Sequence, residues 1–230
     1  MGFPWGPGWQ AYFRGRHVLI TGASEGVGLE LAKALVPAGA RVTLLSRSEP
    51  KLRAAEAAAL SAASAAAAGD RSAGPAGGGG AGGRRVTCVV AADVTDEAAV
   101  AAAVAEAAAA LGEVQILLCC AGAAECGYFH TSDTAAHRRM MDLNYMGVVH
   151  ALRAALPAMV AAREGHVVAV ASTLSLMGAI GYSAYAPSKF AVRGLMETLR
   201  NELQGTNVRV SICYPPDMDT PGYAREGLTK

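Results

Sequence analysis

Short runs of apolar residues alternate along the chain with longer segments in which apolar and polar positions follow a helical spacing. The runs predict six buried strands: His17–Ile20, Arg41–Leu45, Val86–Ala91, Gln115–Cys120, His166–Ala171 and Arg209–Cys213. The segments between them predict helices over Leu29–Val36, Glu49–Ala68, Asp96–Leu111, Ala135–Ala162 and Ala184–Leu203. Strands that are apolar throughout are buried on both faces, which indicates an α/β domain with a doubly wound parallel sheet. Ligands of such a sheet bind at the carboxyl ends of its strands.

Two segments fall outside this alternation. Residues 1–16 carry five aromatic side chains among Pro and Gly, and they predict an N-terminal arm that is disordered or packed on the surface. The alternative for this arm is contact with a membrane interface, where aromatic side chains gather. Residues 69–85 are almost entirely Gly, Ala, Ser, Pro and Arg, which predicts a flexible surface insert. The rest of the chain, residues 17–230, is long enough for one large domain.

Composition restricts the class of protein. Hydrophobic residues make up 52% of the 230 residues, which predicts a packed globule. The net charge of +1 provides no field for a phosphate backbone, and we therefore expect no nucleic-acid partner. The five cysteines are odd in number and lack metal-site spacing, which indicates buried thiols in a reducing, cytoplasmic compartment and no metal site. We expect neither a signal peptide nor a membrane-spanning helix.

A glycine-rich turn follows the first predicted strand directly. Its sequence is Thr21-Gly-Ala-Ser-Glu-Gly-Val-Gly28, and it leads into a helix. Glycines in such a turn let the backbone approach a pyrophosphate, while the N-terminus of the helix supplies N–H donors. The strand–turn–helix context therefore predicts a dinucleotide site. Its predicted contacts are Gly22, Ser24, Glu25, Gly26 and Gly28.

The second predicted strand ends in Ser46 and Arg47. A site that prefers NAD would place a carboxylate here to hold the 2′-hydroxyl of the adenosine ribose. A hydroxyl and a guanidinium are instead donors suited to a 2′-phosphate. The sequence therefore favours NADP(H) over NAD(H).

Tyr185 and Lys189 are four residues apart in a predicted helix, so that their side chains share one face. A Tyr proton ordinarily leaves near pH 10, which is too high for a reaction at neutral pH. A neighbouring cation favours the phenolate and lowers that pKa, which makes Tyr a usable general acid or base. The pair is therefore a candidate for proton transfer.

These motifs, in this order, resemble the short-chain dehydrogenase/reductase family, and the resemblance covers nearly the whole chain. It implies a Rossmann-type fold, a nicotinamide cofactor and oxidoreductase activity between a ketone and an alcohol. Further matching positions are Asp93 and Val94 after the third strand, Cys119-Cys-Ala-Gly122 at the end of the fourth, Asn144 in the long helix, Ser172 after the fifth strand, and Pro215 and Thr220 after the sixth.

The resemblance implies a catalytic set of Asn144, Ser172, Tyr185 and Lys189. Tyr185 exchanges a proton with the substrate oxygen, which Ser172, thirteen residues upstream, orients. Lys189 binds the nicotinamide ribose and lowers the pKa of Tyr185, and Asn144 positions a water in the proton relay. The implied cofactor contacts beyond the glycine turn are Ser46, Arg47, Asp93, Val94, Ala121, Gly122, Tyr185, Lys189, Pro215 and Thr220.

A narrower resemblance lies in the run Tyr214-Pro-Pro-Asp-Met-Asp-Thr-Pro-Gly222, which is similar to a run in 3-ketodihydrosphingosine reductases. It implies NADPH-dependent reduction of 3-ketodihydrosphingosine to dihydrosphingosine in sphingolipid synthesis, by a homo-oligomer at the cytosolic face of the endoplasmic reticulum membrane. Two features depart from the family. Cys119 stands where Asn is usual, and the chain ends at Lys230, where we expect the substrate-loop helices and the last strand to be truncated.

Two other functions remain open on sequence grounds. One is reduction of another carbonyl, such as a 3-oxoacyl thioester or a sterol. The other is a truncated NADP-binding protein without catalysis, against which the intact set of Ser172, Tyr185 and Lys189 argues.

Overall fold

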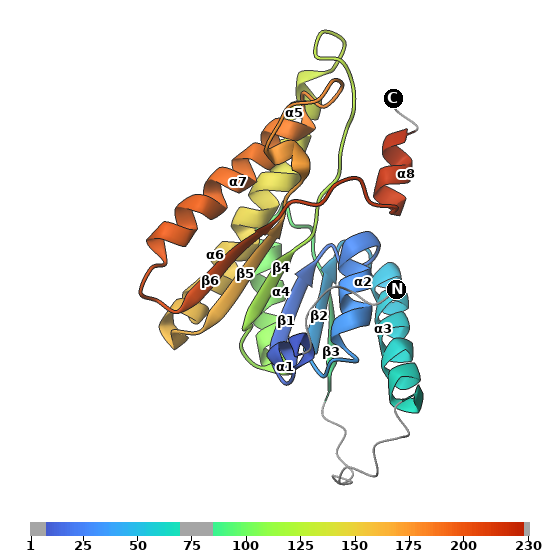
Figure 1. The fold of residues 1–230 in the computed structure, drawn as a ribbon, viewed down its shortest axis with the longest axis vertical. Coiled ribbons are helices and arrows are strands. Elements are labelled where there is room, and N and C mark those ends of the chain that lie inside the picture. The colour runs from blue at the N-terminus through green and yellow to red at the C-terminus, as the bar shows by residue number, and fades with distance from the viewer. Residues whose placement is uncertain (1–7, 70–84, 228–230) are drawn as a thin grey trace.

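Six parallel strands form the centre of the molecule. The structure, a computed structural model, describes residues 8–69 and 85–227. The strands are β1 (His17–Thr21), β2 (Arg41–Ser46), β3 (Thr87–Ala91), β4 (Ile116–Cys119), β5 (Gly165–Val170) and β6 (Val208–Cys213). They pair in the order β3-β2-β1-β4-β5-β6 (Figure 1), and every pairing is parallel. The predicted doubly wound sheet is confirmed, and the order reverses between β1 and β4, where ligands of such sheets bind.

Helices cover the sheet on both faces, as Figure 1 shows. The connecting helices are α2 (Gly26–Leu35), α3 (Glu49–Gly69), α4 (Glu97–Leu111), α5 (Thr134–Met140), α6 (Gly147–Ala162) and α7 (Tyr185–Glu202). A single turn of π-helix, η1 (Met141–Met146), joins α5 to α6, and a 3-10 turn, η2 (Thr173–Ser175), follows β5. Two short helices lie near the ends of the described chain, α1 (Trp9–Phe13) and α8 (Pro221–Gly227).

The alternation of side chains along each strand divides the core into two clusters. Leu19, Leu45 and Leu117 pack with α4, α6 and α7 on one face, while Ile20 and Leu44 pack with α2 and α3 on the other. All five side chains are fully buried, and each contributes about 1.5–3 kcal/mol by its removal from water. Burial on both faces explains why these strands are apolar throughout.

The described part of the N-terminal arm packs against the sheet. The Tyr12 hydroxyl lies 3.0 Å from Nδ1 of His166 on β5. The guanidinium carbons of Arg16 and Arg209 lie 4.4 and 4.9 Å from the centre of the Tyr12 ring, within the range of a cation–π interaction. Burial and the two nearby arginines lower the pKa of His166. The aromatic ring of Tyr12 thus packs this segment against β5 and β6.

Several boundaries differ from the prediction. Helix α2 begins at Gly26 instead of Leu29, because the glycine turn itself forms the first helical turn. The predicted helix over Ala135–Ala162 is interrupted by η1, where Asn144 is fully buried. Helices α1 and α8 were not predicted, since five and seven residues are too short for a periodic pattern. Apart from its two ends, the predicted insert at 69–85 lies outside the described residues.

One helical segment, Thr134–Ala162, is long and apolar enough to cross a membrane, by length and composition alone. In the structure it covers the sheet. Val148, Ala151, Leu152, Ala155 and Met159 are buried in the core cluster on that face. Packing within the domain therefore accounts for the apolar composition of this segment.

The glycine turn leaves no room for side chains at two positions. A Cβ on Gly28 would lie 2.4 Å from the carbonyl oxygen of Gly22, and a Cβ on Gly22 would lie 2.7 Å from Cα of Ala121. Gly22 also has a φ of 68°, in the region that favours glycine. The turn is therefore packed against its own backbone and against the loop after β4.

The Gly28→Ala substitution should lower the free energy of unfolding by about 1–3 kcal/mol, because the backbone must move to admit the methyl group. Gly194→Ala in α7 is the matched control, since a Cβ there meets nothing within 4 Å. That variant should gain up to about 1 kcal/mol from helix propensity. Urea denaturation measures both, and equal stability of Gly28→Ala and the wild type would contradict the contact.

Candidate active site

One cavity of about 650 Å³ lies at the carboxyl ends of the strands, around the point where the strand order reverses. It brings together most of the residues that the sequence predicts. The predicted residues in its lining are Gly22, Ser24, Glu25, Gly26, Gly28, Ser46, Arg47, Val94, Ala121, Gly122, Ser172, Tyr185, Lys189, Pro215 and Thr220. These residues come from segments far apart in the sequence, and the parallel sheet collects them at one edge.

The end of the cavity near β2 is suited to an anionic group. The hydroxyl of Ser46 is buried and has no hydrogen-bond partner within the described chain. Arg47 follows it, with its side chain 73% exposed and 3.8 Å from Asp93. Lys51, in the first turn of α3, lies 3.1 Å from Glu25 of the glycine turn. A buried hydroxyl without a partner and two exposed cations fit a phosphate-bearing ribose.

The other end of the cavity holds the predicted catalytic side chains. Ser172 caps η2 and accepts a hydrogen bond from the N–H of Leu174 at 3.1 Å. Its hydroxyl also interacts with the phenol of Tyr185, which begins α7. The ammonium of Lys189 donates to the carbonyl oxygen of Val170 at 3.0 Å and lies 5.7 Å from the centre of the Tyr185 ring. These contacts fix all three side chains relative to one another.

The protein groups alone shift the two pKa values against the sequence expectation. Burial raises the pKa of Tyr185 to about 12, and the hydrogen bond from Ser172 offsets only part of this effect. Burial also lowers the pKa of Lys189 to about 8. The expected lowering of the Tyr185 pKa by Lys189 is therefore wrong for the protein without ligands. The phenol therefore stays protonated at neutral pH, and its raised pKa makes it a weaker acid than an ordinary Tyr.

Asn144 makes hydrogen bonds within the protein, and its predicted role in positioning a water stays a prediction. It is fully buried, and its amide accepts from the N–H of Ala123 at 3.0 Å and donates to the carbonyl of Ala123 at 2.9 Å. The same amide nitrogen donates to the hydroxyl of Ser188 at 3.0 Å, which donates to the carbonyl of Tyr185 at 2.6 Å. Asn144 does not line the cavity. Its side chain connects the loop after β4 to the first turn of α7.

Asp93 also lies outside the cavity lining. One carboxylate oxygen accepts from the N–H and the hydroxyl of Thr95, at 3.0 and 2.9 Å. The other lies near Arg47. Asp93 therefore shapes the loop after β3 and contacts the cation at the phosphate-binding end.

Cys119, the departure from the family, is buried at the end of β4, and burial raises the pKa of its thiol to about 12. The loop that follows is held from the neighbouring strand. The hydroxyl of Thr21 accepts from the N–H groups of Cys120 and Ala121 at 3.1 and 3.2 Å. Thr21 thus connects β1 to the loop after β4, next to an inert thiol.

The cavity also includes residues that the sequence analysis missed. Ser48 and Lys51 follow Arg47 within four residues, and this proximity along the chain could have indicated them as site residues. Asp217 and Met218 belong to the run Tyr214–Gly222 that the sequence analysis singles out, although not as site residues. Among the remaining lining residues, no sequence signal indicates Glu125, Leu174, Tyr182, Tyr223 and Glu226, because loops after different strands bring them to the cavity.

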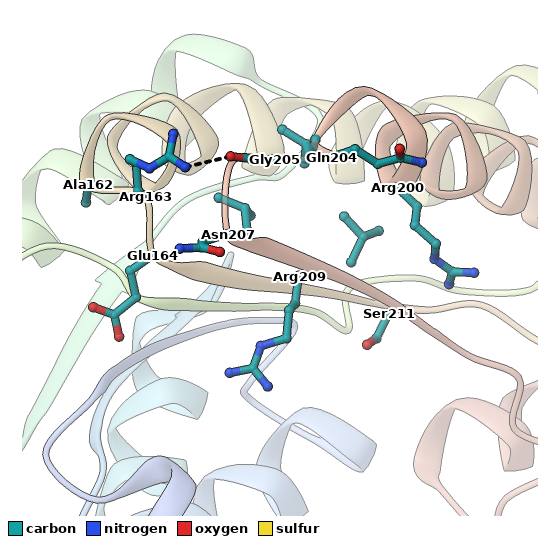
Figure 2. A pocket seen from close by; sticks show the side chains of 12 residues that line it. Ala162, Arg163, Glu164, Arg200, Gln204, Gly205, Asn207, Arg209 and Ser211 are labelled. Carbon is teal, nitrogen blue, oxygen red and sulfur yellow. Dashed lines mark hydrogen bonds between the residues drawn. The ribbon is translucent and has the colours of Figure 1, made fainter.

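A second hollow, of about 890 Å³, lies at the opposite edge of the sheet. Figure 2 shows it between the turns that precede β5 and β6, where Arg163 donates to the carbonyl of Gly205 at 2.8 Å. It contains none of the predicted site residues. Because the amino ends of parallel strands do not bind ligands in this type of fold, we assign the active site to the carboxyl edge.

Comparison with known families identifies the family of this chain. Residues 16–73 and 79–228 match the family model for short chain dehydrogenases. The chain belongs to the short-chain dehydrogenase family. The fold of this family binds a nicotinamide cofactor.

Relatives of this short-chain dehydrogenase include 3-ketodihydrosphingosine reductases. The protein from Dictyostelium discoideum is 36% identical over 94% of this chain and 64% of its own length. The protein from Bos taurus is 36% identical over 94% of this chain and 60% of its own length. The chain thus spans somewhat over half the length of the curated relatives that it matches.

Solved structures agree on the fold. Levodione reductase superposes with a TM-score of 0.80 at 27% identity, over 93% of this chain and 76% of that protein. An actinorhodin polyketide ketoreductase variant solved with NADPH gives a TM-score of 0.80 at 26% identity, over 91% of this chain and 73% of that protein. The Rossmann-type architecture predicted for this short-chain dehydrogenase is confirmed.

The buried ammonium of Lys189 should give the stability a distinct dependence on pH. Its pKa is about 8 in the folded protein, against 10.5 ordinarily, so that between these values only the unfolded chain keeps the proton. The free energy of unfolding should therefore rise with pH across this window, by up to about 3 kcal/mol, and this contribution is lost as the pH falls through 8. Lys189→Met removes the titrating group.

Urea denaturation of the wild type and of Lys189→Met at several pH values between 7 and 10 measures the effect. Tyr185 titrates in both proteins, and its contribution largely cancels in the difference between them. The stability of the wild type relative to the variant should increase with pH. A difference that is constant across the window would contradict the burial of a charged Lys189.

Proposed function

We propose that this protein uses NADPH to reduce the ketone of a long-chain 3-keto amine of the 3-ketodihydrosphingosine class to a secondary alcohol. The observation that carries the proposal is the convergence of Ser172, Tyr185 and Lys189 in the cavity at the carboxyl edge. The names of the relatives from Dictyostelium discoideum and Bos taurus support the substrate class. Reduction of a 3-oxoacyl thioester or a sterol is the alternative that the assays below test.

In the proposed reaction Tyr185 donates its phenolic proton to the carbonyl oxygen, which becomes the hydroxyl of the product. When bound, NADPH supplies the hydride that reduces the carbonyl carbon. The hydroxyl of Ser172 accepts from the backbone N–H of Leu174 and interacts with the phenol of Tyr185, and a substrate oxygen that takes the place of this second contact would be held near Tyr185. The phenol of Tyr185 is protonated at neutral pH, as the proton donor of a reduction must be. The ammonium of Lys189 lies 5.7 Å from the centre of the Tyr185 ring, and it would bind the nicotinamide ribose.

Preference for NADPH is supported at the β2 end of the cavity. The hydroxyl of Ser46 and the guanidinium of Arg47 are donors in a region where a site for NAD has a carboxylate. Arg47 would hold the 2′-phosphate, and the buried hydroxyl of Ser46 would donate to the same group. The nearest carboxylate, Asp93, lies 3.8 Å from Arg47 and restrains its position.

Exposed apolar side chains next to the cavity support a long-chain substrate. The loops after β4 and β5 are joined by a parallel bridge between Gly127 and Tyr182. Beside this bridge, five large apolar side chains are between 52% and 83% exposed. They are Tyr128, Phe129, Leu176, Met177 and Ile180. An alkyl chain on this surface would remove apolar area from water, at about 25 cal/mol per Å².

The proposal extends to the place in the cell where the protein acts and to its oligomeric state. A long-chain base partitions into lipid bilayers, and we therefore propose that the protein acts at the cytosolic face of the endoplasmic reticulum membrane. We also propose a homo-oligomer, supported by an apolar groove between α6 and α7. Its lining includes Leu152, Leu156, Val160, Leu195 and Leu199.

The substrate class is tested by NADPH oxidation with three ketones at equal concentration in detergent micelles. We expect turnover with a C18 3-keto amine, and kcat/KM at least about tenfold lower with a 3-oxoacyl thioester and with a 3-keto sterol. A preference for the thioester or the sterol would replace the proposed substrate. Tight NADPH binding without turnover on any of the three would support a cofactor-binding protein without catalysis.

Tyr185→Phe should reduce kcat by at least about a thousandfold, because Tyr185 is the proposed proton donor and Phe has no proton to give. The affinity for NADPH should change less than about threefold, since the ring is retained. Tyr128→Phe is the control, because this Tyr is 60% exposed on the loop after β4. Turnover of Tyr185→Phe near the wild-type rate would exclude the mechanism.

Arg47→Leu should weaken NADPH binding by about 10- to 100-fold, which is the loss expected for a charge-assisted contact to phosphate. The affinity for NADH should change little, because NADH lacks the 2′-phosphate. Fluorescence titration with the two cofactors gives both values. An equal loss for NADPH and NADH would show that Arg47 acts on the fold of the site and not on the phosphate.

A further inference from the structure

The two ends of the active-site cavity differ in the charge of their linings. The cofactor end has the cations Arg47 and Lys51 and one carboxylate, Glu25, which pairs with Lys51. The end beyond Tyr185 has three carboxylates, which belong to Glu125, Asp217 and Glu226. Lys189 lies between the two ends, and its ammonium donates to a backbone carbonyl. The substrate end is therefore electrostatically suited to a cationic ligand.

The three carboxylates have different surroundings. Glu125 forms an ion pair with Arg139 at 2.6 Å. Asp217 is exposed and accepts from the hydroxyl of Tyr223 at 3.2 Å. Glu226, from α8, is half-buried and accepts from the hydroxyl of Tyr182 at 3.3 Å.

Two observations place Glu226 beside the proton donor. The ring of Tyr182, which holds Glu226, lies 6.0 Å from the ring of Tyr185, centre to centre. The charge of Glu226 also contributes to the raised pKa of Tyr185. A group that binds Glu226 therefore lies close to a substrate oxygen that receives the Tyr185 proton.

We propose that Glu226, oriented by Tyr182, binds the ammonium group of an amino ketone whose amine is on the carbon next to the carbonyl. The inference rests on the proposed function and adds to it the recognition of the amine. In such a substrate the nitrogen is one carbon from the reacting carbonyl, which agrees with the placement of Glu226 beside Tyr182 and of Tyr182 beside Tyr185. A charge-assisted hydrogen bond in a half-buried site would select the amino ketone over a neutral ketone with the same chain.

The test compares two C18 3-ketones that share the 1-hydroxyl and differ in the 2-amino group, assayed with NADPH at about pH 6.5, where the amine is charged. Glu226→Gln keeps the size of the side chain and its ability to accept from Tyr182. We expect kcat/KM for the amino ketone to fall by about 10- to 100-fold relative to that for the deaminated ketone. The ratio between the two substrates is the readout, because the effect of Glu226 on Tyr185 applies to both.

Glu197→Gln is the matched control, an exposed carboxylate on α7 that pairs with Arg193 at 2.7 Å. Unchanged affinity of Glu226→Gln for NADPH shows that the site is folded, and Glu226→Asp, which keeps the charge, should recover part of the preference. A substrate ratio that is unchanged in Glu226→Gln, or that falls instead in Asp217→Asn, overturns the inference alone. A wild-type protein that reduces neither ketone overturns the proposed function, and the inference with it.

Discussion

The parallel hydrogen bonding of the six strands is the constraint on which the active site depends. Parallel pairing forces the carboxyl ends of β1, β2, β4, β5 and β6 to one edge, and the loops that leave this edge carry the functional residues. The glycine turn, Ser46, Ser172 and Pro215 are far apart in the chain and meet only for this reason. Burial of both faces fixes the sheet, since a shift of one residue would move every side chain to the other face.

A buried polar network then sets the position of the catalytic helix. The amide of Asn144 pairs with both backbone groups of Ala123 and reaches Tyr185 through Ser188. A π-helical turn in the long helix accompanies this arrangement, with Asn144 inside it. Buried polar groups are expensive unless they are satisfied, and a satisfied network of this kind permits one arrangement of the three segments. The rigidity of the first turn of α7 is thus provided from two other parts of the chain.

The charges of the site reflect a balance between burial and interaction. Burial alone favours a neutral Tyr185 and opposes the charge on Lys189. The carbonyl of Val170 and the hydroxyl of Ser172 keep both side chains in place despite this cost. The lining includes the cations Arg47 and Lys51 at one end and the carboxylates of Asp217 and Glu226 at the other, and this distribution of charge supports the proposed cofactor and the proposed substrate.

The sequence by itself determined the sheet, the glycine turn and the pair of Tyr185 and Lys189, because each of these depends on neighbours along a single strand, turn or helix. It also determined the family, because the motifs stand in a fixed order, and Thr220 and Arg47 were placed at the cavity by that order. The role of Asn144, the pKa of Tyr185 and the presence of Glu226 in the cavity were decided only by the tertiary structure. Each of the three depends on contacts between elements far apart in the chain and on the loss of water around them. None of them is encoded in the spacing of residues.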